Sequence, residues 1–299
     1  MAKFSEIQQV IINATDTFAQ GLEKTGTYAF RLAKRRITSD MDVNFPTNSD
    51  SPHLIRSDKN ETLANDIINN LLNAMFTSTF NNRLEAFASV PKEINERTLQ
   101  YYRDNFGEPS AETIREANAQ SVKCTTVINQ AMGETALFDN IFAPATNAMF
   151  GHISKGSTVN ATVTDMENRI NNRFTSYLRP LGASLLQACA RDINAIYADS
   201  FELVWVSYKR RPTDADRRDY CVAHESRLGN NPTHYHINEV KQEWSNWDGG
   251  DWEGMIKGTN SNNILTYAGG YNCYHYYEYV KASQVNAADK ARARSKGYI

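Results

Sequence analysis

The last hundred residues contain most of the chain's rare side chains, and this crowding constrains the fold more than any other feature. All four tryptophans, four of the six histidines and two of the four cysteines fall between Trp205 and His275. The segment is otherwise polar and rich in turn residues, so it has little material for a large core. We therefore expect a small module that aromatic anchors and a Cys/His cross-link hold together.

Composition excludes several classes of protein. The chain has 299 residues, a formal net charge of −2 and 41% hydrophobic residues, which does not suit a general binder of polyanions. Its apolar runs are far shorter than the roughly 18–20 residues of a membrane-spanning helix, and its start lacks the apolar core and cleavage site of a signal peptide. We expect an intracellular product with reduced cysteines and no membrane partner.

Residues 1–200 follow mainly helical periodicity. The strongest pattern is an apolar stripe that predicts a long helix over about residues 164–198, begun by a capping box at Thr164 and Glu167 and kinked at Pro180. Its apolar positions are Met166, Ile170, Phe174, Tyr177, Leu178, Leu181, Leu185, Cys189, Ile193 and Ile196. Cys189 on this stripe and Cys124 among other apolar residues are expected to be inert core thiols.

Two segments interrupt the helical pattern. Residues 38–60 and 138–163 are rich in Gly, Pro, Ser, Asp and Asn, which favours extended or irregular connections. Either segment suits an ordinary flexible connection or an arm that becomes ordered only against a neighbouring subunit.

The periodicity changes at Phe201, which predicts a small α+β module over residues 201–282. We expect a first strand around Trp205, a charged turn over 209–218, a short helix over 238–244, and strands over 264–267 and 274–280. The predicted fold class is therefore a mainly α N-terminal region followed by a small α+β module. Residues 283–299 form a basic tail or exposed helix.

Several short motifs in the last third of the chain resemble a known family. They are residues 190–195 (Ala-Arg-Asp-Ile-Asn-Ala), Trp205-Val206, residues 216–221 (Asp-Arg-Arg-Asp-Tyr-Cys) and residues 269–275 (Gly-Gly-Tyr-Asn-Cys-Tyr-His). This pattern is similar to the C-terminal module of the Mu F-like minor head, or head morphogenesis, proteins of tailed phages. That family usually ends in Asn-Cys-Arg-Cys or Asn-Cys-Arg-His, whereas Tyr274 replaces the arginine here.

The resemblance implies a structural component of a virion, made in the cytoplasm of an infected bacterium, without chemistry of its own. Its implied partners are portal, capsid or tail-connector proteins, and further copies of the same chain as a homo-oligomer. The tail residues Lys290, Arg292, Arg294 and Lys296 suit an acidic neighbour or non-specific contact with packaged DNA. On this interpretation, removing the tail leaves the isolated protein folded.

A second hypothesis is a nuclease or toxin-like enzyme. His224, His234, His236 and His275, together with Glu225 or Glu239, supply the groups that general acid–base cleavage of a phosphodiester requires. No familiar metalloprotease, nucleophile-elbow or phosphate-loop motif accompanies them, so the residues favour the non-enzymatic interpretation.

Cys221 and Cys273 flank the predicted module, and we expect them to lie close together. A disulfide between them would close a loop of about fifty residues, worth about 4 kcal/mol by chain entropy. Alternatively Cys221, His224, Cys273 and His275 offer the two thiolates and two imidazoles of a closed structural zinc site, which suits a reducing compartment. Neighbouring free thiols are the third alternative.

Overall fold

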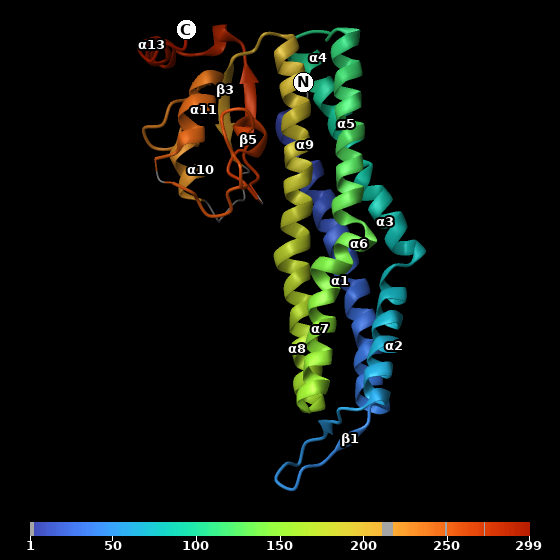
Figure 1. Ribbon diagram of the computed structural model, residues 1–299. Coiled ribbons are helices and arrows are strands. Elements are labelled where there is room, and N and C mark those ends of the chain that lie inside the picture. Colours follow the sequence, from blue (N-terminus) through green and yellow to red (C-terminus); the bar gives the residue numbers. More distant parts are fainter. Residues whose placement is uncertain (1–2, 211–217, 249, 272) are drawn as a thin grey trace. The chain divides into compact units, whose positions relative to one another are not determined.

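The computed structural model describes residues 3–299 except 211–217, 249 and 272. The chain is mainly helical, with one small antiparallel sheet near its C-terminus, which confirms the predicted fold class (Figure 1). It divides into two compact units, whose boundaries differ from those expected at residues 200 and 282. The first unit comprises residues 1–14, 88–127 and 181–299, and the second comprises residues 15–87 and 128–180.

The second unit consists of helices and one short hairpin. Helix α1 (Phe4–Asp40), most of which belongs to this unit, is followed by strands β1 (Val43–Asn44) and β2 (His53–Leu54) and by helices α2 (Asp58–Met75) and α3 (Ser78–Ala88). Helix α6 (Glu134–Leu137), the π-helical turn η1 (Phe138–Phe142), α7 (Ala143–Lys155), α8 (Val159–Arg173) and the π-helical turn η2 (Phe174–Leu178) complete it. Helix α7 packs against α8 and α2 (Figure 1).

The expectation of an irregular segment over residues 138–163 was wrong, because most of it is helical. Pro144 is the second residue of α7, directly after the π-helical turn η1, where the change in helix type accommodates a proline in a continuing helix. Gly156 ends the helix with a φ of 63°, a left-handed conformation that favours glycine. Helix α8 then begins before the expected capping box, since the Thr158 hydroxyl accepts a hydrogen bond from the Ala161 N–H.

The expected kink at Pro180 corresponds to a change in helix type. Pro180 is the second residue of α9 (Arg179–Ser200), directly after the π-helical turn η2. A proline in a continuing helix clashes with the carbonyl group four residues earlier, and a π turn is one way to relieve that clash.

The first unit contains the start of α1, helices α4 (Val90–Asn105), α5 (Ala111–Met132) and α9, and the C-terminal module. Cys124 of α5 and Cys189 of α9 form a disulfide, so the expectation of two inert thiols was wrong. The two helices bring the Cα atoms of these cysteines to 5.9 Å from each other, a separation that a disulfide spans.

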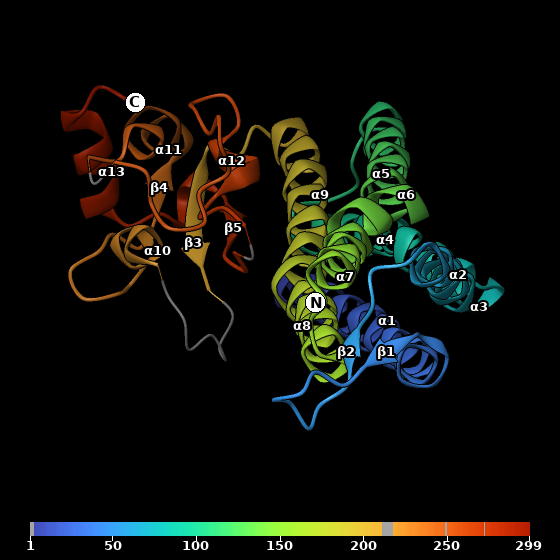
Figure 2. The same cartoon turned by 60° about the horizontal axis from the view of Figure 1, so that its bottom comes forward.

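The C-terminal module is built on a sheet in the order β4-β3-β5 (Figure 2). The central strand β3 (Trp205–Lys209) pairs antiparallel with β4 (Tyr235–His236) and β5 (Tyr276–Val280). Helices α10 (Asp219–His224), α11 (Ile237–Glu243), α12 (Ile264–Tyr267) and α13 (Ala287–Ser295) surround it, with 3-10 turns η3 (Trp244–Asn246) and η4 (Ala282–Gln284).

Most of the expected elements of the module are present. The short helix expected over residues 238–244 is α11, and alternate residues of β5 are buried. The strand expected over residues 264–267 was wrong, because a run of four such residues does not distinguish a strand from a helical turn, and it forms α12. Most of the expected charged turn, residues 211–217, lies outside the described residues.

Candidate metal centre

Three of the predicted ligands meet inside the module. Cys221 lies on α10, and Cys273 and His275 lie in the segment that enters β5. The Cys221 Sγ and Cys273 Sγ atoms are 3.9 Å apart, and Cys273 Sγ is 3.7 Å from His275 Nδ1. All three side chains are buried, and one ligand atom from each lies within 4.8 Å of the others. The expected proximity of the two cysteines is confirmed, and both are free thiols in this structure.

His224 was wrongly grouped with these ligands. Its ring stacks on Trp244 with the ring centroids 4.0 Å apart and contacts the edge of Tyr220 at 4.7 Å. Residues three apart on a helix differ by about 60° in direction, so the Cys221 side chain can reach the metal centre while His224 enters the aromatic cluster. Burial lowers the pKa of His224 to about 3, so this histidine is neutral.

Tyr208 and Gly269 complete the immediate surroundings of the two sulfurs. The Tyr208 hydroxyl lies 3.7 Å from Cys221 Sγ and 3.6 Å from Cys273 Sγ, and its ring stacks on His275 with centroids 4.9 Å apart. A Cβ atom at Gly269 would clash with both sulfurs. The first glycine of the Gly-Gly-Tyr-Asn-Cys-Tyr-His motif is therefore required because the sulfurs occupy the space of a side chain.

Arg191 of α9 holds the segment that carries Cys273 and His275. Its buried guanidinium donates hydrogen bonds to the carbonyl oxygens of Cys273 and His275, both at 2.7 Å, and to that of Thr266 at 2.8 Å. One turn further along the helix, Asn194 donates to the Tyr277 carbonyl oxygen at 2.9 Å. A charged donor satisfies several buried carbonyl groups at once, which fixes the path of the chain through the site.

Two further residues of the family-like motifs bind the same region. The Asp192 carboxylate accepts hydrogen bonds from Thr266 and Gln120, and burial raises its pKa. Arg218 donates to the carbonyl oxygens of Gly269 and Tyr271. The motif residues 216, 217 and 272 lie outside the described residues. Motifs that are about eighty residues apart in sequence therefore converge on one site.

The two thiols differ in acidity. Hydrogen bonding between the sulfurs lowers the pKa of Cys273 well below its ordinary value, and the nearby His275 and Arg191 act in the same direction. The same sulfur–sulfur contact, together with burial, raises the pKa of Cys221. Two neighbouring buried thiolates would repel each other, so a site that holds both requires a cation between them.

The remaining candidates for acid–base chemistry have structural contacts. His236 Nδ1 accepts a hydrogen bond from the Asn238 N–H and so caps α11, and burial lowers the pKa of both His234 and His236. Glu239 is buried and lies 3.0 Å from an Arg292 nitrogen. His275 Nε2 is 3.9 Å from a Glu225 carboxylate oxygen, the one pair in this set that lies at the metal centre.

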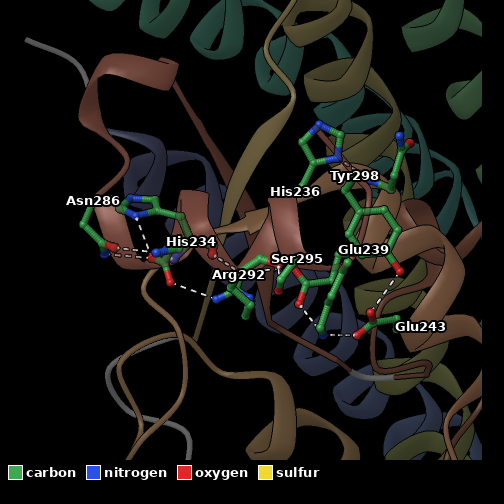
Figure 3. A network of polar contacts seen from close by, with 11 residues as sticks. His234, His236, Glu239, Glu243, Asn286, Arg292, Ser295 and Tyr298 are labelled. Carbon is green, nitrogen blue, oxygen red and sulfur yellow. Dashed lines mark hydrogen bonds and ion pairs between the residues drawn. The ribbon is translucent and has the colours of Figure 1, made fainter.

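The basic tail forms α13, and part of its charge is neutralised within the chain (Figure 3). Arg292 binds the Asp289 and Glu239 carboxylates, and Lys296 binds Glu239 and Glu243. Within the described part of the chain, no ion pair is found for the two other predicted tail cations, Lys290 and Arg294.

Apolar contacts also attach this helix to the module. Val285 and Ala293 are buried in a cluster with Trp205 of β3, and the Asp289 carboxylate accepts a hydrogen bond from the His234 N–H at 2.9 Å. These contacts favour a tail that is part of the folded module over a separable arm.

Sequence reasoning missed the roles of Tyr208, Gly269 and Arg191. The first strand was expected only around Trp205, and the charged residues that follow gave no indication that the strand extends through Tyr208 to Lys209. Gly269 and Arg191 stood inside the quoted motifs, but only the spatial arrangement shows what they contact.

Comparison of the chain with known proteins found no matching family model, no matching curated protein and no matching solved structure. A separate search of the described helices found none with the length and apolar character that crossing a membrane requires.

Proposed function

We propose that the chain is a structural component of a tailed-phage virion, a minor head or head–tail connection protein of the Mu F-like type that acts in head assembly. The observation that carries this proposal is the convergence of three of the four family-like motifs on one site. Arg191 and Asn194 from α9 bind the backbone of the segment that contains Cys273 and His275. The residues behind the resemblance thus act together in holding the module's fold.

The environment of the histidines supports this proposal over a nuclease. General acid–base catalysis needs a group that reaches the substrate and titrates near the working pH. His224 is packed between aromatic rings with its pKa lowered to about 3, and His236 caps a helix. These contacts stabilise the module. They also occupy two of the histidine side chains that the enzymatic hypothesis requires as general acid or base.

The proposed partners are portal, capsid or tail-connector subunits and other copies of this chain. Among the tail cations, Lys290 and Arg294 are the candidates for contact with packaged DNA, since Arg292 and Lys296 already have carboxylate partners in the described structure. Such contact would depend on phosphate charge, so its affinity should fall as salt is raised, without preference for sequence.

Mass spectrometry of particles tests the proposed location. Virions purified from the producing culture by two successive density gradients should contain peptides of this chain at a fixed ratio to the major capsid protein. The matched control is the particle-free lysate from the same culture. Presence of the chain in that lysate alone would contradict a structural role in the virion.

We further propose that Cys221, Cys273 and His275 hold a structural zinc ion. Zinc in proteins binds thiolate sulfur at about 2.3 Å and imidazole nitrogen at about 2.0–2.1 Å, so tetrahedral neighbours lie about 3.5–3.8 Å apart. The sulfur–sulfur and sulfur–nitrogen distances of 3.9 and 3.7 Å are close to these values. The ion would supply the positive charge that lets both buried sulfurs exist as thiolates.

Elemental analysis of protein purified without chelator tests this assignment. We expect one zinc per chain in the unaltered protein and in His224→Phe, and none in Cys221→Ser or Cys273→Ser. After denaturation in chelator without reductant, two thiols should titrate, because Cys124 and Cys189 are joined. Metal-free protein in which two thiols titrate only after denaturation would show that the cluster is only a packed thiol pair.

A further inference from the structure

We infer that Tyr208 is the fourth ligand of this metal centre, so that the site is a closed Cys-Cys-His-Tyr tetrahedron rather than a three-ligand site open to water. The inference rests on the zinc ion proposed above and adds the residue that completes its coordination. It concerns the Oη atom of Tyr208, which no sequence motif indicated.

The separations between the four ligand atoms carry this inference. The Tyr208 hydroxyl lies 3.7 and 3.6 Å from the two sulfurs, the sulfurs are 3.9 Å apart, and Cys273 Sγ is 3.7 Å from His275 Nδ1. Four of the six edges of a tetrahedron formed by these atoms are therefore between 3.6 and 3.9 Å. A central zinc with oxygen, nitrogen and sulfur ligands requires edges of about 3.5–3.8 Å.

The fold leaves Tyr208 little freedom to lie elsewhere. It belongs to the central strand of the sheet and is fully buried, with its ring against His275 on one side and the edge of Trp244 on another. The backbone at Gly269 closes the space beside the sulfurs, where even a Cβ atom would clash.

Coordination by Tyr208 has a simple chemical balance. The phenol O–H bond is replaced by a zinc–oxygen bond, and the proton leaves to solvent, as the thiol protons do when the sulfurs bind. Without a metal, the same hydroxyl makes two weak hydrogen bonds with the sulfurs.

The test is a zinc titration of the chelator-treated full chain, followed in the ultraviolet band of tyrosinate. We expect the band to appear in proportion to bound zinc at neutral pH. Tyr208→Phe should lack the band and bind zinc at least about tenfold more weakly, by comparison with the loss that follows removal of groups supporting a metal ligand. Circular dichroism of the metal-free proteins checks that each variant is folded.

Tyr220→Phe is the matched control. Tyr220 is equally buried in the same module, and its hydroxyl has no hydrogen-bond partner among the described residues. It should keep both the tyrosinate band and the zinc affinity.

The outcomes separate the two proposals. Zinc binding without a tyrosinate band, and with equal affinity in both variants, would overturn the role of Tyr208 and leave the zinc assignment standing. No zinc binding by the unaltered chain would overturn the zinc assignment and the Tyr208 inference together. If Tyr208→Phe fails to fold, the tyrosinate band of the unaltered protein still shows whether a tyrosine binds the zinc ion.

Discussion

The guanidinium of Arg191 donates hydrogen bonds of 2.7 Å to the carbonyl oxygens of both Cys273 and His275. A side chain on the last helix before the module thus fixes the backbone on both sides of Tyr274, within the segment that supplies two of the proposed ligands. The site consequently depends on α9 as much as on the sheet. The module and this helix share one compact unit, in agreement with that dependence.

Replacing Arg191 should destabilise the protein strongly. Arg191→Ala leaves buried carbonyl groups without donors, and we expect a loss of about 3 kcal/mol in the free energy of unfolding, measured by urea denaturation of the metal-free chain. Arg97→Ala is the control, because Arg97 is exposed and forms an ion pair with Glu93 one turn away. It should cost less than about 0.5 kcal/mol. Equal losses in the two variants would contradict the structural role of Arg191.

Gly269→Ala should damage the metal centre by steric overlap. The added methyl group meets both sulfurs, so the site must shift, and we expect a loss of about 1–3 kcal/mol in the stability of the metal-free protein together with weaker zinc binding. Gly151→Ala in α7 adds the same group to open space. That control should be neutral or more stable by up to about 1 kcal/mol. An unchanged stability in Gly269→Ala would show that the sulfurs do not need this gap.

His224 should make the stability of the protein sensitive to acid. Its pKa is lowered in the folded state to about 3, whereas an unfolded histidine has a value near 6.5. Between these values the unfolded chain binds a proton that the folded chain excludes. Above about pH 6.5 the titration of His224 therefore does not change the free energy of unfolding. Below that pH the free energy of unfolding falls by about 1.4 kcal/mol per pH unit as the pH decreases towards 3.

The variant His224→Phe isolates this contribution. Phenylalanine keeps the aromatic contacts with Trp244 and Tyr220 without a titrating group, so the variant should lose less stability than the parent between pH 6.5 and 4. Chemical denaturation of metal-free protein at a series of pH values measures both curves. Parallel curves would mean that His224 does not titrate as its burial requires. His234 and His236 remain in both proteins and cancel in the difference.

Removal of residues 283–299 should destabilise the module. The truncation exposes Trp205, which Val285 and Ala293 cover, and leaves the buried Glu239 without Arg292 and Lys296. We expect a loss of about 3 kcal/mol or more, read from tryptophan fluorescence during urea denaturation. The control is the double variant Lys290→Ala and Arg294→Ala, which should change stability by less than about 0.5 kcal/mol. A fully stable truncated chain would restore the interpretation of residues 283–299 as a separable arm.

The success of the sequence-based predictions depended on how local each signal was. The α11 helix and the alternating burial of β5 follow from neighbouring residues, and both were predicted correctly. Over residues 138–163 the glycine and proline signals were local as well, but Pro144 lies in a continuing helix and Gly156 ends one, so neither marks a long loop. In the sequence, a glycine or proline that interrupts a helix cannot be distinguished from one that ends it. The difference depends on the conformation of the neighbouring turns.

The amino-acid order alone was enough to establish a helical region, a small mixed module and a pair of cysteines that meet, because periodicity and loop closure are properties of the chain itself. Tertiary packing decided the partners of individual atoms. It joined Cys124 to Cys189, directed His224 into the aromatic cluster and placed Tyr208 beside both sulfurs. Such contacts depend on the directions in which side chains leave distant elements, to within about an ångström, and no spacing in the sequence encodes those directions.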